Sequence, residues 1–166
     1  MQICGYVPGS IGHMVELHGR YYAREWRFGP YFEAKVASEL GELLAHLDPK
    51  RDGFWIAAED DEIVGGIAID GSHTREAARL RFFIVDDAHR ETGLGEQLMC
   101  TALDFCRDAG HRRVFLTTFA GLDAARKLYE RHGFTLTEER PRRTWGVEVT
   151  EQRFDLHITH SRTPTC

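Results

Sequence analysis

Apolar residues recur along the chain with either helical or strand spacing, and the order of these patterns predicts a mixed α/β domain. A short strand over 2–7 precedes a helical repeat that begins at Ile11, and a second helix has its apolar face between Val36 and Leu47. Three strands are expected next, because short apolar or alternating runs are separated by turn residues over 54–58, 63–69 and 78–85.

The second half of the chain alternates helix and strand. Helical repeats cover 94–109 and 124–129, and strand patterns cover 114–118, 134–139 and 146–156. This order is that of a mixed sheet with helices packed on it. We expect one domain over 1–166, with a frayed tail over 157–166. Gly65-Gly66, in the middle of a strand, suggests a bulge or a close approach of another segment.

Composition and charge narrow the classes of function. The 166 residues are 42% hydrophobic and 28% charged, which suits a folded domain and argues against a disordered or fibrous chain. The net charge of −5 argues against a nucleic-acid partner, and basic pairs such as Arg112-Arg113 are interpreted as solvated surface. No apolar run reaches the ~20 residues of a membrane helix, and no leader pattern is present. We expect a cytoplasmic protein with no membrane partner.

The four cysteines do not form a recognisable metal site, because none has C-x-x-C or zinc-finger spacing. Cys100 and Cys106 fall within the helix expected over 94–109, where a cysteine behaves as a small hydrophobic residue. The sequence therefore predicts no metal and no need for disulfides, and a reducing compartment fits.

The most informative segment joins the strand ending at Val85 to the helix beginning near Leu94. Gly93 and Gly95 stand at the mouth of this helix, and Arg90 supplies a cation just before them. Unpaired N–H groups and the positive end of the helix dipole attract an anion, and glycines allow a phosphate to reach those N–H groups. The segment predicts an anion site that suits a pyrophosphate.

Three families use such a loop. A P-loop requires Lys followed by Ser or Thr, which do not follow Gly95. A dinucleotide fingerprint requires a third glycine, where Leu98 stands, and its loop usually follows the first strand of the fold. The third family is the GNAT acetyltransferases, whose R/Q-x-x-G-x-G/A signature lies between the fourth strand and the following helix. Arg90, Gly93 and Gly95 match this signature in spacing and place.

A second segment strengthens the resemblance to the GNAT family. Residues 125–134, which read A-R-K-L-Y-E-R-H-G-F, are similar to the family segment A-x-x-L-Y-E-x-x-G-F after the fifth strand. The expected element order also resembles the family fold over nearly the whole chain. The His-Gly-x-x-Tyr run from His18 and the late run from Gly146 to Gln152 are similar to GNAT domains that follow MarR-type DNA-binding domains, although we carry over no DNA binding.

The resemblance implies a GNAT fold, with a mixed, mostly antiparallel central sheet splayed between strands 4 and 5 and flanked by helices. It implies an N-acetyltransferase that moves the acetyl group of acetyl-CoA directly to a primary amine. The acceptor would be a small-molecule amine or a peptide N-terminus, and a homodimer stays open. The residues implied to bind acetyl-CoA are Phe83, Ile84, Val85, Arg90, Glu91, Thr92, Gly93, Leu94, Gly95, Asp123 and Ala125.

In the family, the pantetheine arm enters the gap between strands 4 and 5 and bonds main-chain groups, here those of Phe83 and Val85. An N–H near Val85 would polarise the thioester carbonyl. The resemblance assigns Tyr129 as the acid that protonates the leaving thiolate, while packing is its alternative role. Many members carry an asparagine where this chain has Leu122, so the neighbouring Asp123 is expected to serve as the helix N-cap instead.

The acceptor side is less defined by the sequence. His18, Glu16 and Glu25 are candidates for the base, and Thr117 with Thr118 could order a water in its place. The aromatic segment between Tyr21 and Tyr31, which includes Tyr22 and Trp26, is interpreted in two ways. It either forms the acceptor wall, where rings hold an apolar or cationic group, or builds a second small core under a long loop.

Two other functions stay open. One is a non-catalytic acyl-CoA sensor that keeps the fold and uses binding for regulation. The other is a transferase for a longer acyl group, or one that acts on a hydroxyl.

Overall fold

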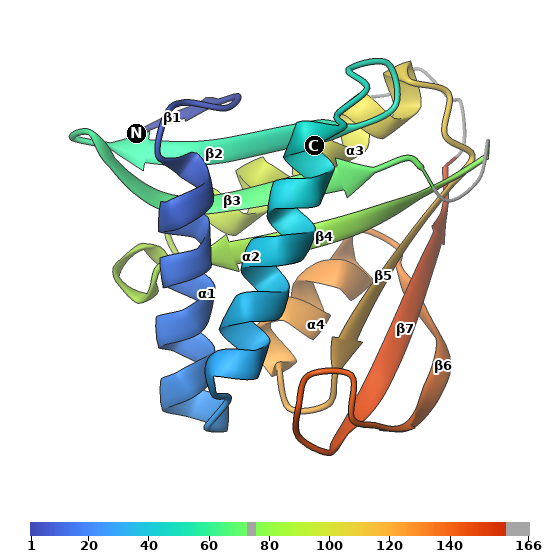
Figure 1. Cartoon of the computed structure of the whole chain (residues 1–166). Helices are drawn as coiled ribbons and strands as arrows, with labels where there is room; N and C mark the ends of the chain where they lie inside the picture. The colour runs from blue at the N-terminus through green and yellow to red at the C-terminus, as the bar shows by residue number, and fades with distance from the viewer. Residues whose placement is uncertain (73–75, 159–166) are drawn as a thin grey trace.

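The computed structural model describes residues 1–72 and 76–158, which form one seven-stranded sheet with helices on both faces (Figure 1). The strand order is β1-β2-β3-β4-β5-β7-β6. Every neighbouring pair is antiparallel except β4 and β5, which run parallel. This is the mixed, mostly antiparallel sheet expected from the sequence.

The first helices are longer than the apolar pattern indicated. After β1 (Gln2–Cys4), α1 spans Ser10–Trp26 and α2 spans Pro30–Ala45. The helix α1 begins after Gly9, with φ 95°, and ends before Arg27, the C-cap residue, which has a left-handed φ of 55°. The aromatic segment is therefore not a long loop: α1 runs through most of it, and a proline at the start of α2 closes the turn.

An antiparallel meander follows, made of β2 (Gly53–Glu59), β3 (Glu62–Asp70) and β4 (Ala77–Val85). Gly65 and Gly66 lie where α1 and β4 press most closely on β3. A Cβ at Gly66 would lie 2.6 Å from Sδ of Met14, and one at Gly65 would lie 2.9 Å from the carbonyl oxygen of Ile84. The expected close approach at these glycines is confirmed.

The remaining elements follow the predicted alternation. A 3₁₀ turn over Asp87–His89 leads to α3 (Leu94–Asp108), β5 (Arg113–Phe119) and α4 (Asp123–Arg131). The last two strands, β6 (Thr135–Arg142) and β7 (Val149–His157), pair with each other, and β7 also pairs with β5.

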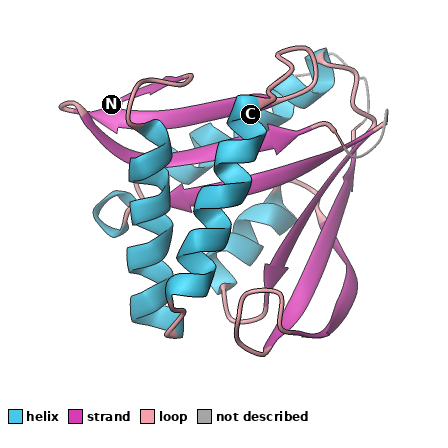
Figure 2. Ribbon diagram, in the orientation of Figure 1, coloured by secondary structure: helices cyan, strands magenta, loops and turns pink. Residues whose placement is uncertain are grey.

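Apolar side chains fill both faces of the sheet. The helices α1 and α2 cover one face and α3 and α4 the other (Figure 2). The largest cluster lies between the sheet and the helices α3 and α4, and it includes Leu98, Leu116 and Phe154. On the opposite face, one cluster centres on Met14 and Ile56, and another gathers aromatic rings around Phe28 and Phe119. The aromatic cluster is the second small core that the sequence suggested.

Two expectations about the chain need correction. His157 is the last residue of β7, and the N–H of Ile158 donates to the carbonyl oxygen of Arg112 at 2.9 Å, so the tail does not fray from 157; the rest of that prediction, over 159–166, lies outside the described residues. Cys100 is disulfide-bonded, although its helical position suggested a small hydrophobic role. Across 1–72 and 76–158, no helix combines the length and apolar character needed to cross a membrane.

Candidate active site

The site is organised by the gap between β4 and β5. In the described part of the chain these strands pair at only three positions, the last being Arg79 with Phe115, and they then diverge (Figure 1). The β4 residues from Leu80 to Val85 therefore have no strand partner on the β5 side. Their backbone groups are available to an extended ligand that enters the gap as a missing strand would. The predicted splay is confirmed.

A bulge in β4 places one phenylalanine on each face of the sheet beside this gap. Phe82 has φ 52°, which is left-handed and uncommon for a residue with a side chain, and the register with β3 shifts there. Phe82 packs with the α1 side, whereas Phe83 packs with the α3 side. Such strain persists where surrounding structure enforces it, often at functional sites.

A cleft of about 690 Å³ opens on the side of α3 and α4. Nine of the eleven residues expected to bind acetyl-CoA line it, namely Phe83, Ile84, Val85, Arg90, Glu91, Gly93, Gly95, Asp123 and Ala125. The other two do not line it. The hydroxyl of Thr92 donates to the carbonyl oxygen of His89 at 2.7 Å, and the side chain of Leu94 is fully buried in the core.

The loop before α3 has the geometry of an anion site. Gly93 precedes the helix with φ 86°, and no side chain caps its N–H groups. The N–H groups of the first helical residues, Leu94, Gly95 and Glu96, therefore lack intrahelical partners. A Cβ at Gly93 would meet no atom within 4 Å, so the space in front of these groups is open to a ligand.

Basic side chains stand around this loop. The Arg90 guanidinium lies 4.3 Å from the ring centre of Tyr21 and forms an ion pair with Asp87 at 3.0 Å. Arg131, from α4, also lines the cleft and pairs with Glu96 at 3.1 Å. Sequence reasoning missed Tyr21 and Arg131 as part of this cleft, because α1 and α4 reach it only through tertiary packing.

The start of α4 differs from the expectation. Asp123 is the first helical residue, Leu122 occupies the N-cap position, and no capping side chain accepts a hydrogen bond from the N–H groups at the start of α4. Asp123 is therefore not the N-cap. Both residues line the cleft, which leaves the N–H groups at this end of α4 unoccupied by a capping side chain.

A second, smaller cavity of about 90 Å³ lies on the side of α1 and α2. Three of the four predicted acceptor-side residues, His18, Tyr22 and Thr117, line it. Trp26 does not: its ring packs on Phe119 at 4.7 Å between centroids, behind the cavity wall. The cavity also has lining residues that the sequence did not single out, among them Lys35, Glu39, Arg79, Arg81 and Trp145.

The two cavities meet at the gap in the sheet. Tyr22, Phe83 and Tyr129 line both of them. The two cavities therefore adjoin at these three rings.

The candidate base is a buried histidine. His18 is 5% exposed, and its Nδ1 lies 2.7 Å from the carbonyl oxygen of Met14. Burial lowers the pKa of His18 to about 4, so the ring is neutral near pH 7. The other candidates are engaged elsewhere, since Glu16 pairs with Arg20 at 2.7 Å and Glu25 with Arg24 at 2.6 Å.

Both tyrosines at the junction are kept protonated by burial. Tyr129 is 6% exposed and packs among Phe83, Phe134 and Phe154. Burial raises its pKa well above the usual range, and the same holds for Tyr22. A phenol that stays protonated can donate a proton or a hydrogen bond, but it does not act as a base near pH 7.

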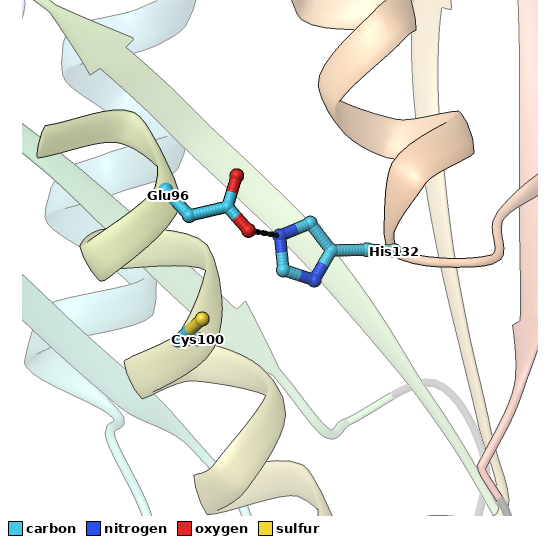
Figure 3. A group of neighbouring side chains, drawn as sticks. All are labelled: Glu96, Cys100 and His132. Carbon is cyan, nitrogen blue, oxygen red and sulfur yellow. Dashed lines mark ion pairs between the residues drawn. The ribbon is translucent and has the colours of Figure 1, made fainter. Parts of the chain in front are cut away.

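One group of side chains near the cleft has the composition of a metal site. Ligand atoms of Glu96, Cys100 and His132 lie within 4.8 Å of one another, and the carboxylate of Glu96 is 2.7 Å from Nε2 of His132 (Figure 3). A metal requires the thiolate form of cysteine, and the Cys100 sulfur is in a disulfide. We therefore interpret the group as an ion pair that joins α3 to the end of α4.

Comparison with known proteins identifies the family. Residues 13–134 match the model of the Acetyltransferase (GNAT) family. This chain belongs to that family.

Named relatives agree with this assignment. Human N-acetyltransferase 8B is 34% identical over 136 residues, which cover 78% of this chain and 57% of the relative, and human N-acetyltransferase 8 is 28% identical, with 80% and 61% covered. N-acetylaspartate synthetase of Xenopus tropicalis is 33% identical over 86% of this chain and 49% of its own. This chain thus spans about three fifths of the length of the two human relatives.

Solved structures share the fold. The structure of yncA from Salmonella typhimurium, solved with its cofactor acetyl-CoA, superposes with a TM-score of 0.77 at 16% identity and covers 99% of this chain and 98% of its own. Ard1 from Thermoplasma volcanium superposes with a TM-score of 0.75 at 22% identity, with 95% and 97% covered.

Proposed function

We propose that this chain is an acetyl-CoA-dependent N-acetyltransferase that transfers an acetyl group directly to a primary amine. The observation that carries the proposal is the meeting of two cavities at Tyr22, Phe83 and Tyr129 through the gap between β4 and β5. A cofactor on one side and an acceptor on the other can then react within the sheet. The acceptor is a small-molecule amine or a peptide N-terminus.

The larger cleft suits coenzyme A. The open space at Gly93 and the unpaired N–H groups at the start of α3 fit a diphosphate. Arg90 and Arg131 add positive charge to the same cleft. The unpaired backbone of β4 beyond Arg79 fits the two amides of the pantetheine arm, which would bond to main-chain groups of Phe83 and Val85.

The reaction is an acyl transfer. The amine nitrogen attacks the thioester carbon, a C–N bond forms, the C–S bond breaks, and the sulfur leaves with the electron pair. Backbone N–H groups of β4 near Val85 stabilise the oxyanion. Tyr129 donates its proton to the leaving thiolate, because it lines both cavities and remains protonated.

The proton lost by the amine goes to His18, directly or through a water held by Thr117 or Thr118. All three residues line the acceptor cavity. Because Nδ1 faces a carbonyl oxygen, it must carry the hydrogen, and Nε2 is left with its lone pair. The low pKa of His18 makes it a weak base. It can take a proton from the acidic ammonium group of the tetrahedral intermediate more readily than from a free alkylammonium ion.

The printed names of two kinds of relatives, N-acetyltransferase 8 and N-acetylaspartate synthetase, both refer to acetylation on nitrogen. They support an amine over a hydroxyl as the acceptor.

Release of free thiol from acetyl-CoA across an amine panel tests the proposal. We expect turnover with at least one amine and tight binding of CoA by calorimetry. Binding without turnover on any amine would support a sensor instead. Titration with propionyl- and succinyl-CoA tests the acyl group. The homodimer stays a prediction, and analytical ultracentrifugation, which measures the mass of the particle in solution, tests it.

A further inference from the structure

Arg79 lies at the point where β4 and β5 separate. It is the last β4 residue paired with β5, opposite Phe115, so it stands where the gap between the strands opens. Its side chain lines the acceptor cavity, together with His18 and Tyr129. A group bound to Arg79 is therefore in the cavity where the acceptor amine must react.

Among the described residues, Arg79 differs from the other basic residues of this cavity in having no ion pair. Arg81 pairs with Glu39 and, at 3.1 Å, with Asp70, and Lys35 also pairs with Glu39. Across the described residues, Nε of Arg79 is buried and has no hydrogen-bond partner. The carboxylates of Glu39, Asp70 and Glu151 act on the charge of Arg79 from a distance, but none of them accepts a hydrogen bond from its buried Nε. This donor is therefore available to an acceptor atom of a ligand.

A second donor with no partner lies in the same cavity. Nε1 of Trp145 is buried and has no hydrogen-bond partner within residues 1–72 and 76–158. Buried donors are usually paired, and each exception calls for an explanation. Arg79 and Trp145 come from distant parts of the chain, and one ligand with oxygen acceptors would satisfy both.

Basic side chains outnumber acidic ones among the residues that line the cavity. Its lining includes Lys35, Arg79 and Arg81 against one carboxylate, Glu39. Burial, followed by the nearby Arg81, lowers the pKa of Arg79, although Glu39, Asp70 and Glu151 oppose this shift, so on balance the surroundings disfavour its positive charge. An anion beside Arg79 would relieve this penalty, whereas an acceptor with further positive charges would increase it.

We propose that the acceptor is an amino acid or a similar molecule whose carboxylate lies close to the reacting amine and is bound by Arg79. The planar guanidinium suits two parallel hydrogen bonds to a carboxylate, and Trp145 supplies a further donor. The cavity has a volume of only about 90 Å³ and is lined by His18 and Tyr129 as well as Arg79. The carboxylate and the reacting amine of the acceptor must therefore be near each other. This inference rests on the proposed function and names its substrate class; it disfavours polyamines and other polycations.

The test compares amino acids with matched analogues. Each acceptor is assayed as the free acid, as its carboxamide and as its decarboxylated amine, with thiol release as the readout. We expect kcat/KM for the acid to exceed that for either analogue by on the order of 10- to 100-fold, the range for hydrogen bonds to a charged group. The Arg79→Met variant, which keeps an unbranched side chain, should abolish this preference, and Arg79→Lys should restore part of it.

Arg112→Met is the matched control, since the Arg112 side chain, immediately before β5, is 72% exposed and lies outside the cavity lining. It should keep the wild-type preference. Equal kcat/KM for acids and carboxamides, or an unchanged preference in folded Arg79→Met, would overturn the inference.

Binding of products separates this inference from the enzyme proposal. Calorimetry of the CoA-loaded protein with N-acetyl amino acids and their amides needs no turnover. Tighter binding of the acids that is lost in Arg79→Met supports the carboxylate site even if no amine is acetylated. Equal binding of acids and amides, while amines are turned over, overturns the carboxylate site and leaves the enzyme.

Discussion

The imidazole Nδ1 of His18 donates a hydrogen bond to the carbonyl oxygen of Met14, 2.7 Å away and one helical turn earlier. The Met14 side chain is fully buried, and a Cβ at Gly66 of β3 would lie 2.6 Å from its sulfur. The packing of α1 on the sheet therefore fixes both the position and the tautomer of His18. The ring faces the acceptor cavity with an unprotonated nitrogen because α1 is anchored at this point.

Burial of His18 makes stability depend on pH. The pKa falls from 6.5 in the unfolded chain to about 4 in the folded protein, so the unfolded chain binds more protons between these values. This contribution to stability is complete above pH 6.5 and is lost as pH falls toward 4, amounting to about 2 kcal/mol by pH 5. We expect His18→Asn to reduce the loss of thermal stability between pH 7.5 and 5. His13→Asn controls for loss of a histidine from the same helix, and an equal change in both variants would contradict the prediction.

Gly93→Val should weaken binding of acetyl-CoA by on the order of 10- to 100-fold, because a branched side chain would fill the space through which a phosphate reaches the N–H groups of α3. Gly110 is a close control. Its own backbone is left-handed, with φ 77° against 86° at Gly93, and a Cβ at Gly110 would also meet no atom within 4 Å. Gly110→Val should therefore carry a similar backbone strain and leave affinity unchanged. Calorimetry with both variants decides, and similar affinities would refute the assignment of the loop.

Tyr129→Phe should lower kcat by on the order of 100-fold, within the range of general acid catalysis, and change the affinity for acetyl-CoA little. The phenyl ring keeps the packing against Phe83, Phe134 and Phe154, and only the proton donor is lost. Steady-state kinetics measures kcat and calorimetry measures affinity. Tyr31→Phe, at a residue that is 61% exposed, is the control. Weakened binding at full kcat would make Tyr129 a packing residue.

Gly66→Ala should destabilise the fold by about 1–3 kcal/mol, because the new Cβ would crowd the Met14 sulfur and lie 2.9 Å from the carbonyl oxygen of Trp55. In contrast, Gly41 lies within α2 with no atom near its Cβ position. Gly41→Ala should stabilise by about 0.5–1 kcal/mol. Urea unfolding of both variants measures these changes, and a neutral effect of Gly66→Ala would show that α1 can shift on β3.

Most of the lining of the larger cleft could be predicted from the sequence. The loop from Arg90 to Gly95 is continuous, and its chemistry depends on backbone N–H groups at a helix start, which a local pattern of glycines reveals. The cap of α4 was predicted wrongly, because Asp123 is a favourable cap by residue type but stands one position inside α4. Helical geometry turns the side chain of Leu94 into the core, so only its backbone N–H belongs to the predicted anion site.

The order of elements and the glycine-rich turn before α3 were determined by the sequence alone, because each depends on residues that are near one another in the chain. Gly65-Gly66 marked the position of a close approach, but the residues that approach it, Met14, Trp55 and Ile84, are distant in sequence. The place of Arg79 at the opening between β4 and β5, the bulge at Phe82 and the meeting of two cavities at Tyr129 were decided only by the tertiary structure. Arg79 has the same alternating pattern as any strand residue. In the described part of the chain its buried Nε has no hydrogen-bond partner, and it stands where two strands distant in sequence separate, a long-range event that has no local signature.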